Sequence, residues 1–354
     1  MSQNMNKKRW VKNIIKRPLY FSLFYMRFFD LFLKILARVR HQYPCVILVY
    51  HRIVNDSSRY LNKGPAIHHH IKHFEREIPY LKIKFQILSM DEVIDHIKSN
   101  RSFKRPSVAI TFDDGYLDNY TLAYPVLKKH AVTATIYLTT NLVGTLNRTW
   151  IDQIERILLN TKKVQFKLPG LFGGKGLPIK TKKEKEQANE KIAESLKKKT
   201  GGELAQLMRE LFEIMEVDDN QTRNCEGRMM LNWDEVQIMA KNGITIGSHS
   251  HNHPILSRMP IQKAKEEIFK SKKVIEENLG IKVKHFAFPN GKEEDFNEEL
   301  GDYCREIGFE SIASVIYGTN GASKGNTLVL KRVVAVSPVW MLAGELVRLF
   351  MRIN

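Results

Sequence analysis

The chain has 354 residues, 43% of them hydrophobic and 27% charged, which is typical of a globular protein with one large α/β domain or two smaller ones. Its three cysteines lack zinc-finger spacing and cannot all pair, which excludes a complete disulfide framework and mildly favours a reducing compartment. The net charge of +18 favours an anionic partner, namely nucleic acid, a membrane or an acidic polymer, unless the basic surface is merely solvated.

Residues 1–42 predict a basic amphipathic helix. Charged residues recur at steps of three and four and so share one helical face: Arg27, Asp30, Lys34 and Arg38. The other faces carry large apolar side chains: Phe21, Phe24, Phe28, Leu31, Phe32, Ile35 and Leu36. The longest uncharged run, 18–26, is too short to span a bilayer. We expect this helix to lie in a membrane interface, with packing against the domain as the alternative, and 339–354 as a weaker second example.

Between 43 and 338, short apolar runs alternate with helical patterns, as in a parallel sheet or barrel. The expected strands are 45–50, 85–88, 107–112, 133–138, 244–246, 283–288, 312–316 and 328–336. The main helical patterns are at 73–98, 120–127, 233–241 and 262–278. A Gly/Pro-rich stretch and a charge-dense helix former at about 160–227 predict an insertion on one face of this domain.

Polar residues follow several of the expected strands, and the carboxyl ends of parallel strands share one ligand-binding edge. Asp113 and Asp114 follow 107–112, while His249 and His253 follow 244–246 at a spacing that puts both rings on one helical face. Two histidines and one carboxylate leave a divalent ion such as zinc with open positions, and the second carboxylate would remain free to accept a proton. Alone, an aspartate pair equally fits a turn or a helix N-cap.

Two other histidine groups receive weaker interpretations. His251 alternates with His249 and His253, so it should point away from the metal and support the ligands at most. The run His68-His69-His70 has no strand before it and no adjacent carboxylate, and we expect a surface loop, with metal binding as a minor alternative.

Three ordered motifs carry a family resemblance: TFDDG at 111–115, H-S-x-x-H at 249–253 and FAFPNG at 286–291. With VYHRI at 49–53 and TWIDQIERIL at 149–158, they resemble the polysaccharide deacetylases, also called carbohydrate esterase family four or the NodB-homology domain. The resemblance runs from about Cys45 to Val336. It implies an irregular (β/α) barrel with the helical insertion, over 43–338.

The resemblance also implies site roles. Asp114, His249 and His253 would hold the metal, expected to be zinc. Asp113 would be the general base for the attacking water, and the backbone N–H of Tyr116 would stabilise the oxyanion. The third motif would contribute substrate contacts from Phe288, Pro289 and Asn290.

The sequence departs from the commonest family pattern, because it lacks a late Leu-x-His motif and the usual Arg of the third motif. Both features match a branch in which the acid histidine follows the first strand, here His51; a core histidine is the alternative. Arg332 would orient Asp113.

The implied function is metal-dependent removal of N-acetyl, or another N-acyl group, from amino sugars of a polysaccharide or lipid-linked glycan of the cell envelope. The alternative is a catalytically inactive glycan- or membrane-binding protein. The charge suggests nucleic acid as a third partner, but no matching motif supports specific binding. We expect a peripheral enzyme on the cytoplasmic face of the inner membrane, with a periplasmic enzyme on an uncleaved anchor as the alternative.

Overall fold

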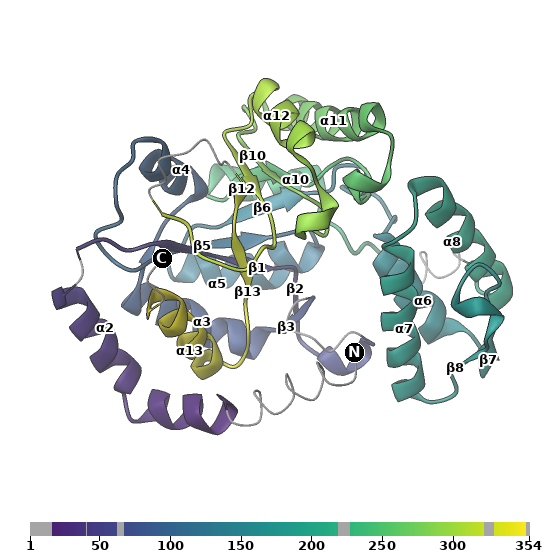
Figure 1. Cartoon of the computed structure of the whole chain (residues 1–354), viewed down its shortest axis with the longest axis horizontal. Helices are drawn as coiled ribbons and strands as arrows, with labels where there is room; N and C mark the ends of the chain where they lie inside the picture. The colour runs from purple at the N-terminus through teal and green to yellow at the C-terminus, as the bar shows by residue number, and fades with distance from the viewer. Residues whose placement is uncertain (1–15, 40, 62–66, 219–226, 322–328, 352–354) are drawn as a thin grey trace.

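The computed structural model describes residues 16–39, 41–61, 67–218, 227–321 and 329–351. A parallel sheet of nine strands forms its centre, in the order β12-β11-β10-β9-β6-β5-β1-β13, with β4 pairing to β5 (Figure 1). The strands are β1 (Cys45–Tyr50), β4 (Gln86–Ile87), β5 (Ser107–Phe112), β6 (Thr135–Leu138), β9 (Thr245–Ser248), β10 (His285–Ala287), β11 (Ser311–Ala313), β12 (Val329–Leu330) and β13 (Arg332–Val334). Only Lys331 separates the two edge strands, so the sheet forms a nearly closed barrel, which confirms the expected fold class.

Helices surround this barrel (Figure 1). They are α3 (Ile71–Lys84), α4 (Met90–Lys98), α5 (Tyr124–Lys129), α10 (Trp233–Lys241), α11 (Ile261–Leu279), α12 (Glu298–Glu306) and α13 (Val339–Met351). Short helical turns lie between them: η1 (Ser57–Arg59), η2 (Asn119–Ala123), η3 (Phe172–Gly174), η4 (Leu256–Arg258) and η5 (Glu293–Asp295). Helices α4 and α10 begin at capping boxes, in which Ser89 and Asn232 bind the third helical N–H.

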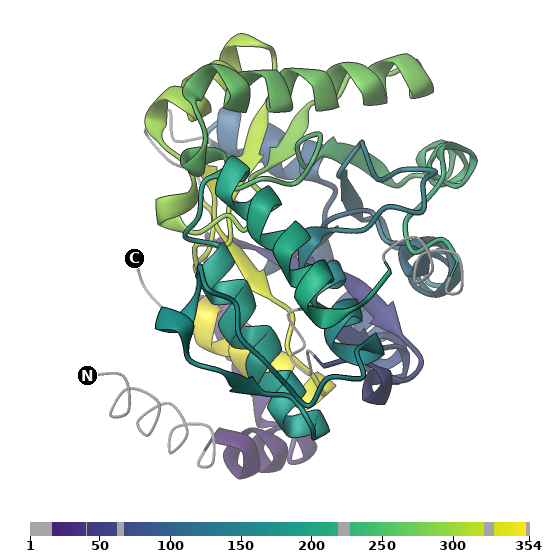
Figure 2. The same cartoon turned by 90° about the vertical axis from the view of Figure 1, so that its right-hand side faces the viewer.

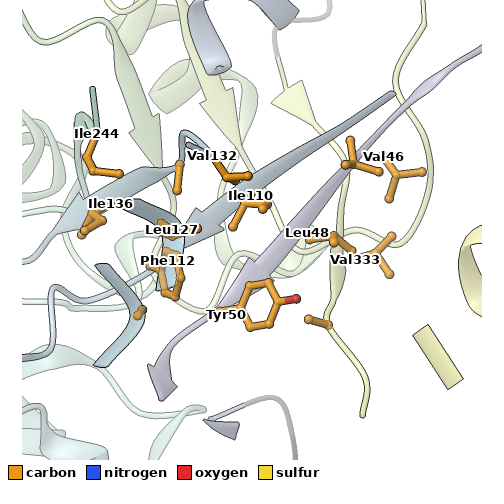
Figure 3. Close-up of a cluster of buried hydrophobic side chains, with 14 of the residues drawn as sticks. Val46, Leu48, Tyr50, Ile110, Phe112, Leu127, Val132, Ile136, Ile244 and Val333 are labelled. Atoms are coloured by element: carbon orange, nitrogen blue, oxygen red, sulfur yellow. The ribbon is translucent and has the colours of Figure 1, made fainter. Parts of the chain in front are cut away.

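The core lies mainly between the sheet and the helices. Every second residue of the central strands points outward into it, such as Leu48 on β1 and Ile110 and Phe112 on β5 (Figure 3). The remaining residues point into the barrel, where space is limited. Gly247 illustrates this limit, because a Cβ at that position would lie 2.5 Å from the ring of Tyr137.

The insertion expected at 160–227 forms a second hydrophobic core. It comprises α6 (Trp150–Asn160), β7 (Gln165–Phe166), β8 (Leu177–Pro178), α7 (Lys182–Leu196) and α8 (Gly201–Met215). These elements lie on one side of the barrel (Figures 1 and 2). Ile157, Ile192 and Leu211 are completely buried in its core, so the insertion is a packed layer that begins one helix earlier than the sequence suggested.

The interpretation of His68–His70 as a surface loop is wrong. These residues form β3 (His68–His70), which pairs in parallel with β2 (Arg52–Val54). His69 is buried, and its Nε2 lies 2.9 Å from a carboxylate oxygen of the equally buried Glu77. The missing carboxylate therefore comes from the next helix, and the histidines serve packing.

The basic N-terminal region forms two helical segments, 16–25 and α2 (Phe28–Val39), separated by a turn where Arg27 has a φ of +60°. Tyr20, Phe29 and Leu33 pack against the core. Other large apolar side chains of this region are exposed, and we call them the apolar N-terminal face: Leu19, Phe21, Tyr25, Met26, Phe28, Leu31, Ile35 and Val39. No helix within the described part of the chain is both long and apolar enough to cross a membrane.

The C-terminal helix differs from the sequence expectation of an interfacial segment. In α13, Leu342, Leu346 and Phe350 are almost completely buried, and Phe350 stacks on Phe85 at the end of α3. The apolar side of α13 is therefore part of the barrel core, where it also contacts α2.

Candidate active site

Three predicted metal ligands meet at the carboxyl end of the barrel. Asp114 follows β5, and both histidines follow β9. Asp114 Oδ1 lies 3.1 Å from His253 Nε2 and 3.5 Å from His249 Nε2. All three residues are buried, and they are the single such group of His, Cys, Asp or Glu side chains in the described ranges that could hold a metal ion.

The hydrogen bonds around these residues suit a cation. His249 Nδ1 lies 2.7 Å from the carbonyl oxygen of Ala287, so it donates its N–H there and leaves Nε2 with a lone pair. Asp114 Oδ1 is buried, and the polar atoms that face it are the ring nitrogens of His253 and His249. A buried carboxylate oxygen facing two ring nitrogens needs a positive charge, and a tetrahedral ion such as zinc accepts this donor set.

His249 and His253 differ in the direction of their pKa shifts. Burial lowers the pKa of His249 to about 4, so this ring is neutral and ready to bind metal at neutral pH. Burial would also lower the pKa of His253, but the charge of Asp114 raises it above its ordinary value. Burial would raise the pKa of Asp114, but His253 and the other imidazoles lower it well below its usual range. The pair Asp114–His253 therefore carries a proton that a metal would displace.

Asp113 is held by Arg332 from β13. The guanidinium donates from Nη1 to Oδ1 at 2.7 Å and from Nη2 to Oδ2 at 2.8 Å, and its Nε donates to the Ser314 carbonyl at 2.7 Å. Burial would raise the pKa of Asp113, but the Arg332 charge lowers it below its ordinary value. The structure thus brings these two predicted residues into direct contact and fixes the carboxylate plane.

His51 and Tyr116 also lie at this edge. The imidazole of His51 is close enough to Asp113 and Asp114 to contribute to lowering the pKa of both carboxyls. His51 Nδ1 is buried without a hydrogen-bond partner among the described residues, and Asn119 Nδ2 donates to the His51 carbonyl at 2.7 Å. Tyr116 is opposite Met230 in a bridge whose hydrogen bonds are made by the neighbouring residues, so this bridge does not engage the Tyr116 N–H.

Backbone conformations that non-glycine residues rarely adopt gather around the site. Asp114, Ser250, His253 and Asn290 all have φ between +59° and +74°. Gly115 follows with a φ of +81°, and a Cβ there would lie 2.7 Å from Leu138. Such strain is concentrated at functional sites, where the surrounding structure holds a side chain in a required direction.

The comparisons with known proteins agree with this geometry. The family described as polysaccharide deacetylase matches residues 100–166 and 212–312. The chain belongs to the polysaccharide deacetylase family. The interval between the two matched segments, 167–211, falls within the insertion, so the matched segments are mainly the barrel and the turns that carry the predicted metal ligands.

Curated relatives match this chain over short segments. A candidate polysaccharide deacetylase of Bacillus subtilis, YxkH, is 36% identical over 28% of this chain and 33% of its own length. The poly-β-1,6-N-acetyl-D-glucosamine N-deacetylase of Staphylococcus epidermidis is 34% identical over 28% of this chain and 37% of its own length. The matches thus span about a third of either relative.

Solved structures share the fold of this deacetylase-family chain. The Streptococcus pyogenes deacetylase PplD, in complex with acetate, has a TM-score of 0.57 at 17% identity, covering 88% of this chain and 100% of its own. IcaB from Ammonifex degensii has a TM-score of 0.55 at 17% identity, covering 86% of this chain and 97% of its own.

The predicted substrate contacts of the third motif are only partly accessible. Phe288 is buried and stacks on Phe296 at a centroid distance of 4.6 Å, so its ring is part of the core and the predicted contact from it is not supported. Pro289 is also buried. Asn290 is partly exposed, and its Nδ2 donates to Asp295.

His251 lies outside the metal ligands, as its alternation with them suggested. Its Nδ1 lies 2.8 Å from Thr140 Oγ1, and its carbonyl accepts the Asn141 N–H at 2.9 Å. It thereby joins the loop after β6 to the loop that carries His249 and His253. Sequence reasoning missed this partner because Thr140 belongs to no motif.

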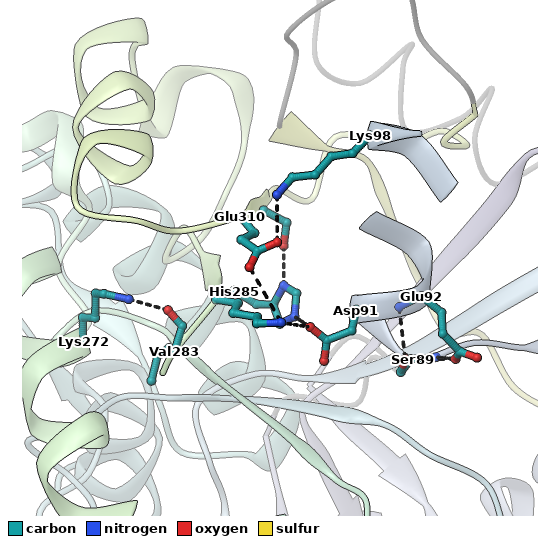
Figure 4. Close-up of polar contacts among 10 residues, drawn as sticks. Ser89, Asp91, Glu92, Lys98, Lys272, Val283, His285 and Glu310 are labelled. Carbon is teal, nitrogen blue, oxygen red and sulfur yellow. Dashed lines mark hydrogen bonds and ion pairs between the residues drawn. The ribbon is translucent and has the colours of Figure 1, made fainter. Parts of the chain in front are cut away.

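A polar cluster around His285 lies at the amino end of the strands (Figure 4). His285 Nδ1 lies 2.8 Å from Ser311 Oγ, and its Nε2 lies 3.3 Å from an oxygen of Asp91. The order Ser–His–Asp resembles a hydrolytic triad, but Ser311 is completely buried and no substrate can reach it. The cluster joins β10, β11 and α4.

Proposed function

We propose that this protein is a metal-dependent hydrolase that removes an N-acetyl, or another N-acyl, group from amino sugars of a polysaccharide or lipid-linked glycan. The observation that carries this proposal is the buried group Asp114, His249 and His253 beside the Arg332-bound Asp113. The name of the Staphylococcus epidermidis relative, an N-deacetylase of a poly-N-acetylglucosamine, supports the same reaction class.

The residues of the site account for both halves of amide hydrolysis. A divalent cation at Asp114, His249 and His253 would supply Lewis-acid polarisation of the acyl carbonyl and lower the pKa of water. Asp113 accepts a proton from the attacking water, whose oxygen forms the new bond to the acyl carbon. The Tyr116 N–H stabilises the oxyanion. The C–N bond then breaks, and His51 donates a proton to the leaving amine.

Arg332 sets the strength of Asp113 as a base. Each oxygen of Asp113 accepts one hydrogen bond from Arg332 and retains a second lone pair for the proton of water. The contact lowers the pKa of Asp113 and keeps it ionised, while the two parallel bonds orient it. Arg332 is therefore a positioning residue in this proposal.

We also propose that the enzyme works at an anionic membrane surface, as a peripheral protein. The apolar N-terminal face supports this proposal, because eight large apolar side chains are exposed across the two helical segments and the turn between them. Basic side chains including Arg17, Lys34 and Arg38 are exposed on the same two segments and would favour anionic lipids. The cytoplasmic face stays a prediction from the sequence.

Mass spectrometry of products from N-acetylated polymers and lipid-linked glycans tests the proposed reaction. The wild-type protein with a divalent metal should release acetate and expose free amines, and Asp113→Asn should lose this activity. If Asp113→Asn deacetylates as fast as wild type, the assignment of the base is wrong. If no glycan loses an acyl group with any divalent metal, the result favours the alternative of a catalytically inactive glycan- or membrane-binding protein.

A further inference from the structure

A cavity of about 430 Å³ lies beside the catalytic turn and is lined by four arginines. Its wall comes from four separate parts of the chain: Arg52 with Arg59 and Tyr60; Leu117, Asp118 and Thr121; Arg156 on α6; and Arg228 with Met229. Arg52 directly follows His51, and Leu117 follows Tyr116. The cavity is therefore next to the site where the acyl group would be cleaved, on the side of the insertion.

Arg52 is the buried element of this cavity. It is only 7% exposed, and its guanidinium lies 5.0 Å from the ring centre of Tyr116 and 4.9 Å from that of Tyr60. Its Nε donates to Asp118 at 2.9 Å, but its Nη1 is buried without a hydrogen-bond partner in the described structure. A buried guanidinium N–H without an acceptor is costly, so this position calls for an acceptor from a ligand.

The other arginines extend the donor surface toward solvent. Arg228 forms a bidentate pair with Glu235, and Arg59 Nε lies 3.5 Å from an oxygen of Asp56. Glu235 and Asp56 thus each contact a single arginine, Arg228 and Arg59 respectively. Guanidinium groups donate hydrogen bonds and cannot accept them, so the ligand must present acceptor oxygens, and carboxylates and phosphates match this geometry best.

We propose that this arginine cavity is a subsite for an anionic group, a carboxylate or a phosphate, on the glycan that the enzyme deacetylates. This inference rests on the proposed function. It narrows the substrate class to N-acylated glycans with an acidic substituent near the cleaved sugar, such as an adjacent uronate or a sugar phosphate.

Matched substrates test the subsite. An N-acetylglucosamine oligomer is compared with the same oligomer carrying one phosphate and with one carrying a uronate, which separates the two sources of negative charge. Wild type should favour at least one acidic oligomer through a lower KM. In Arg59→Gln/Arg156→Gln, KM for that oligomer should rise roughly 3- to 30-fold with kcat retained, while the neutral oligomer is unaffected. Arg101→Gln, which removes an exposed charge outside the cavity, is the control.

Equal KM for neutral and acidic oligomers in wild type, or an equal change in the control variant, would overturn the subsite. Binding of the same oligomers to Asp113→Asn, measured by titration calorimetry, separates this result from failure of the proposed reaction. A preference for acidic oligomers without turnover in wild type would support the subsite and contradict the deacetylase. Indifferent binding would contradict the subsite whatever the turnover.

Discussion

Arg332 and Asp113 are 219 residues apart in the chain and form a doubly hydrogen-bonded pair inside the barrel, with the Arg332 side chain completely buried. The contact joins the last strand of the sheet, β13, to the turn after β5. The residue proposed as general base is thus fixed by the element that completes the barrel.

Removal of Arg332 should change the pH dependence of catalysis. In Arg332→Gln, burial of Asp113 is no longer offset, so the pKa of Asp113 should rise and the acid limb of kcat/KM should move to higher pH. The unfolding free energy at pH 7 should fall by about 3–5 kcal/mol, because a buried charge loses its partner. An unchanged acid limb together with normal metal content would contradict the assignment of Asp113 as the base.

The same pair should contribute to stability in a defined pH range. Because the pKa of Asp113 is lower in the folded protein, its contribution is complete above the unfolded pKa of about 3.9 and is lost as pH falls through the folded value. Denaturant unfolding between pH 3 and 7 measures this slope. Asp113→Asn should reduce the slope, and a slope identical to that of wild type would exclude the coupling.

Metal binding should weaken as pH falls. The raised pKa of His253 means that the metal-free site holds a proton that the cation must displace, so zinc affinity should decrease below neutral pH. Zinc content after dialysis over a pH series measures this. Asp114→Ala should lose the ion at every pH, whereas the neighbouring His251→Gln should retain it. Equal zinc content in both variants would place the metal elsewhere.

His51 should matter most when the leaving group needs a proton. In His51→Gln, amide hydrolysis should fall by about 10²- to 10⁴-fold, whereas hydrolysis of nitrophenyl acetate, whose leaving group needs none, should fall much less. Zinc content and unfolding temperature should be unchanged, since His51 Nδ1 has no hydrogen-bond partner to lose among the described residues. Equal losses on both substrates would assign another role to His51.

The apolar N-terminal face should bind lipid. Leu31 and Ile35 are about half exposed on α2, so Leu31→Ser/Ile35→Ser should weaken cosedimentation with anionic vesicles by roughly tenfold or more at unchanged stability. Ile238→Ser/Phe269→Ser, with similar exposure on other helices, is the matched control. Vesicles of neutral lipid test the contribution of the basic residues. Equal loss in both double variants would argue against a specific face.

The position of the site could be predicted from the sequence because of strand geometry. Strands β5 and β9 are short apolar runs that end in polar residues, and parallel pairing brings such ends to one edge. This rule sufficed to bring Asp114, His249 and His253 together. It could not reveal that Phe288 turns into the core. The sequence pattern of an aromatic residue after a strand is the same whether the ring contacts Phe296 or a ligand.

Other features depend on contacts between distant segments. The strand His68–His70 is three residues long and owes its burial to pairing with β2 and to Glu77, neither of which a local pattern shows. For α13, the amphipathic pattern was correct, but a pattern does not state whether lipid or protein covers the apolar side. The arginine cavity draws on four segments, and although Arg52 and Arg156 lie in or beside motifs, no local pattern shows that Arg59 and Arg228 join them.

The insertion has a hydrophobic core separate from that of the barrel, yet its helix α6 carries Arg156 into the cavity beside the catalytic turn. One wall of the proposed recognition cavity thus depends on a different core from that of the metal ligands. Substitutions at Ile192 or Leu211 can reshape one wall of the cavity without displacing the metal ligands. Engineering of the glycan preference can therefore target the insertion and leave the barrel, which carries the proposed metal ligands, intact.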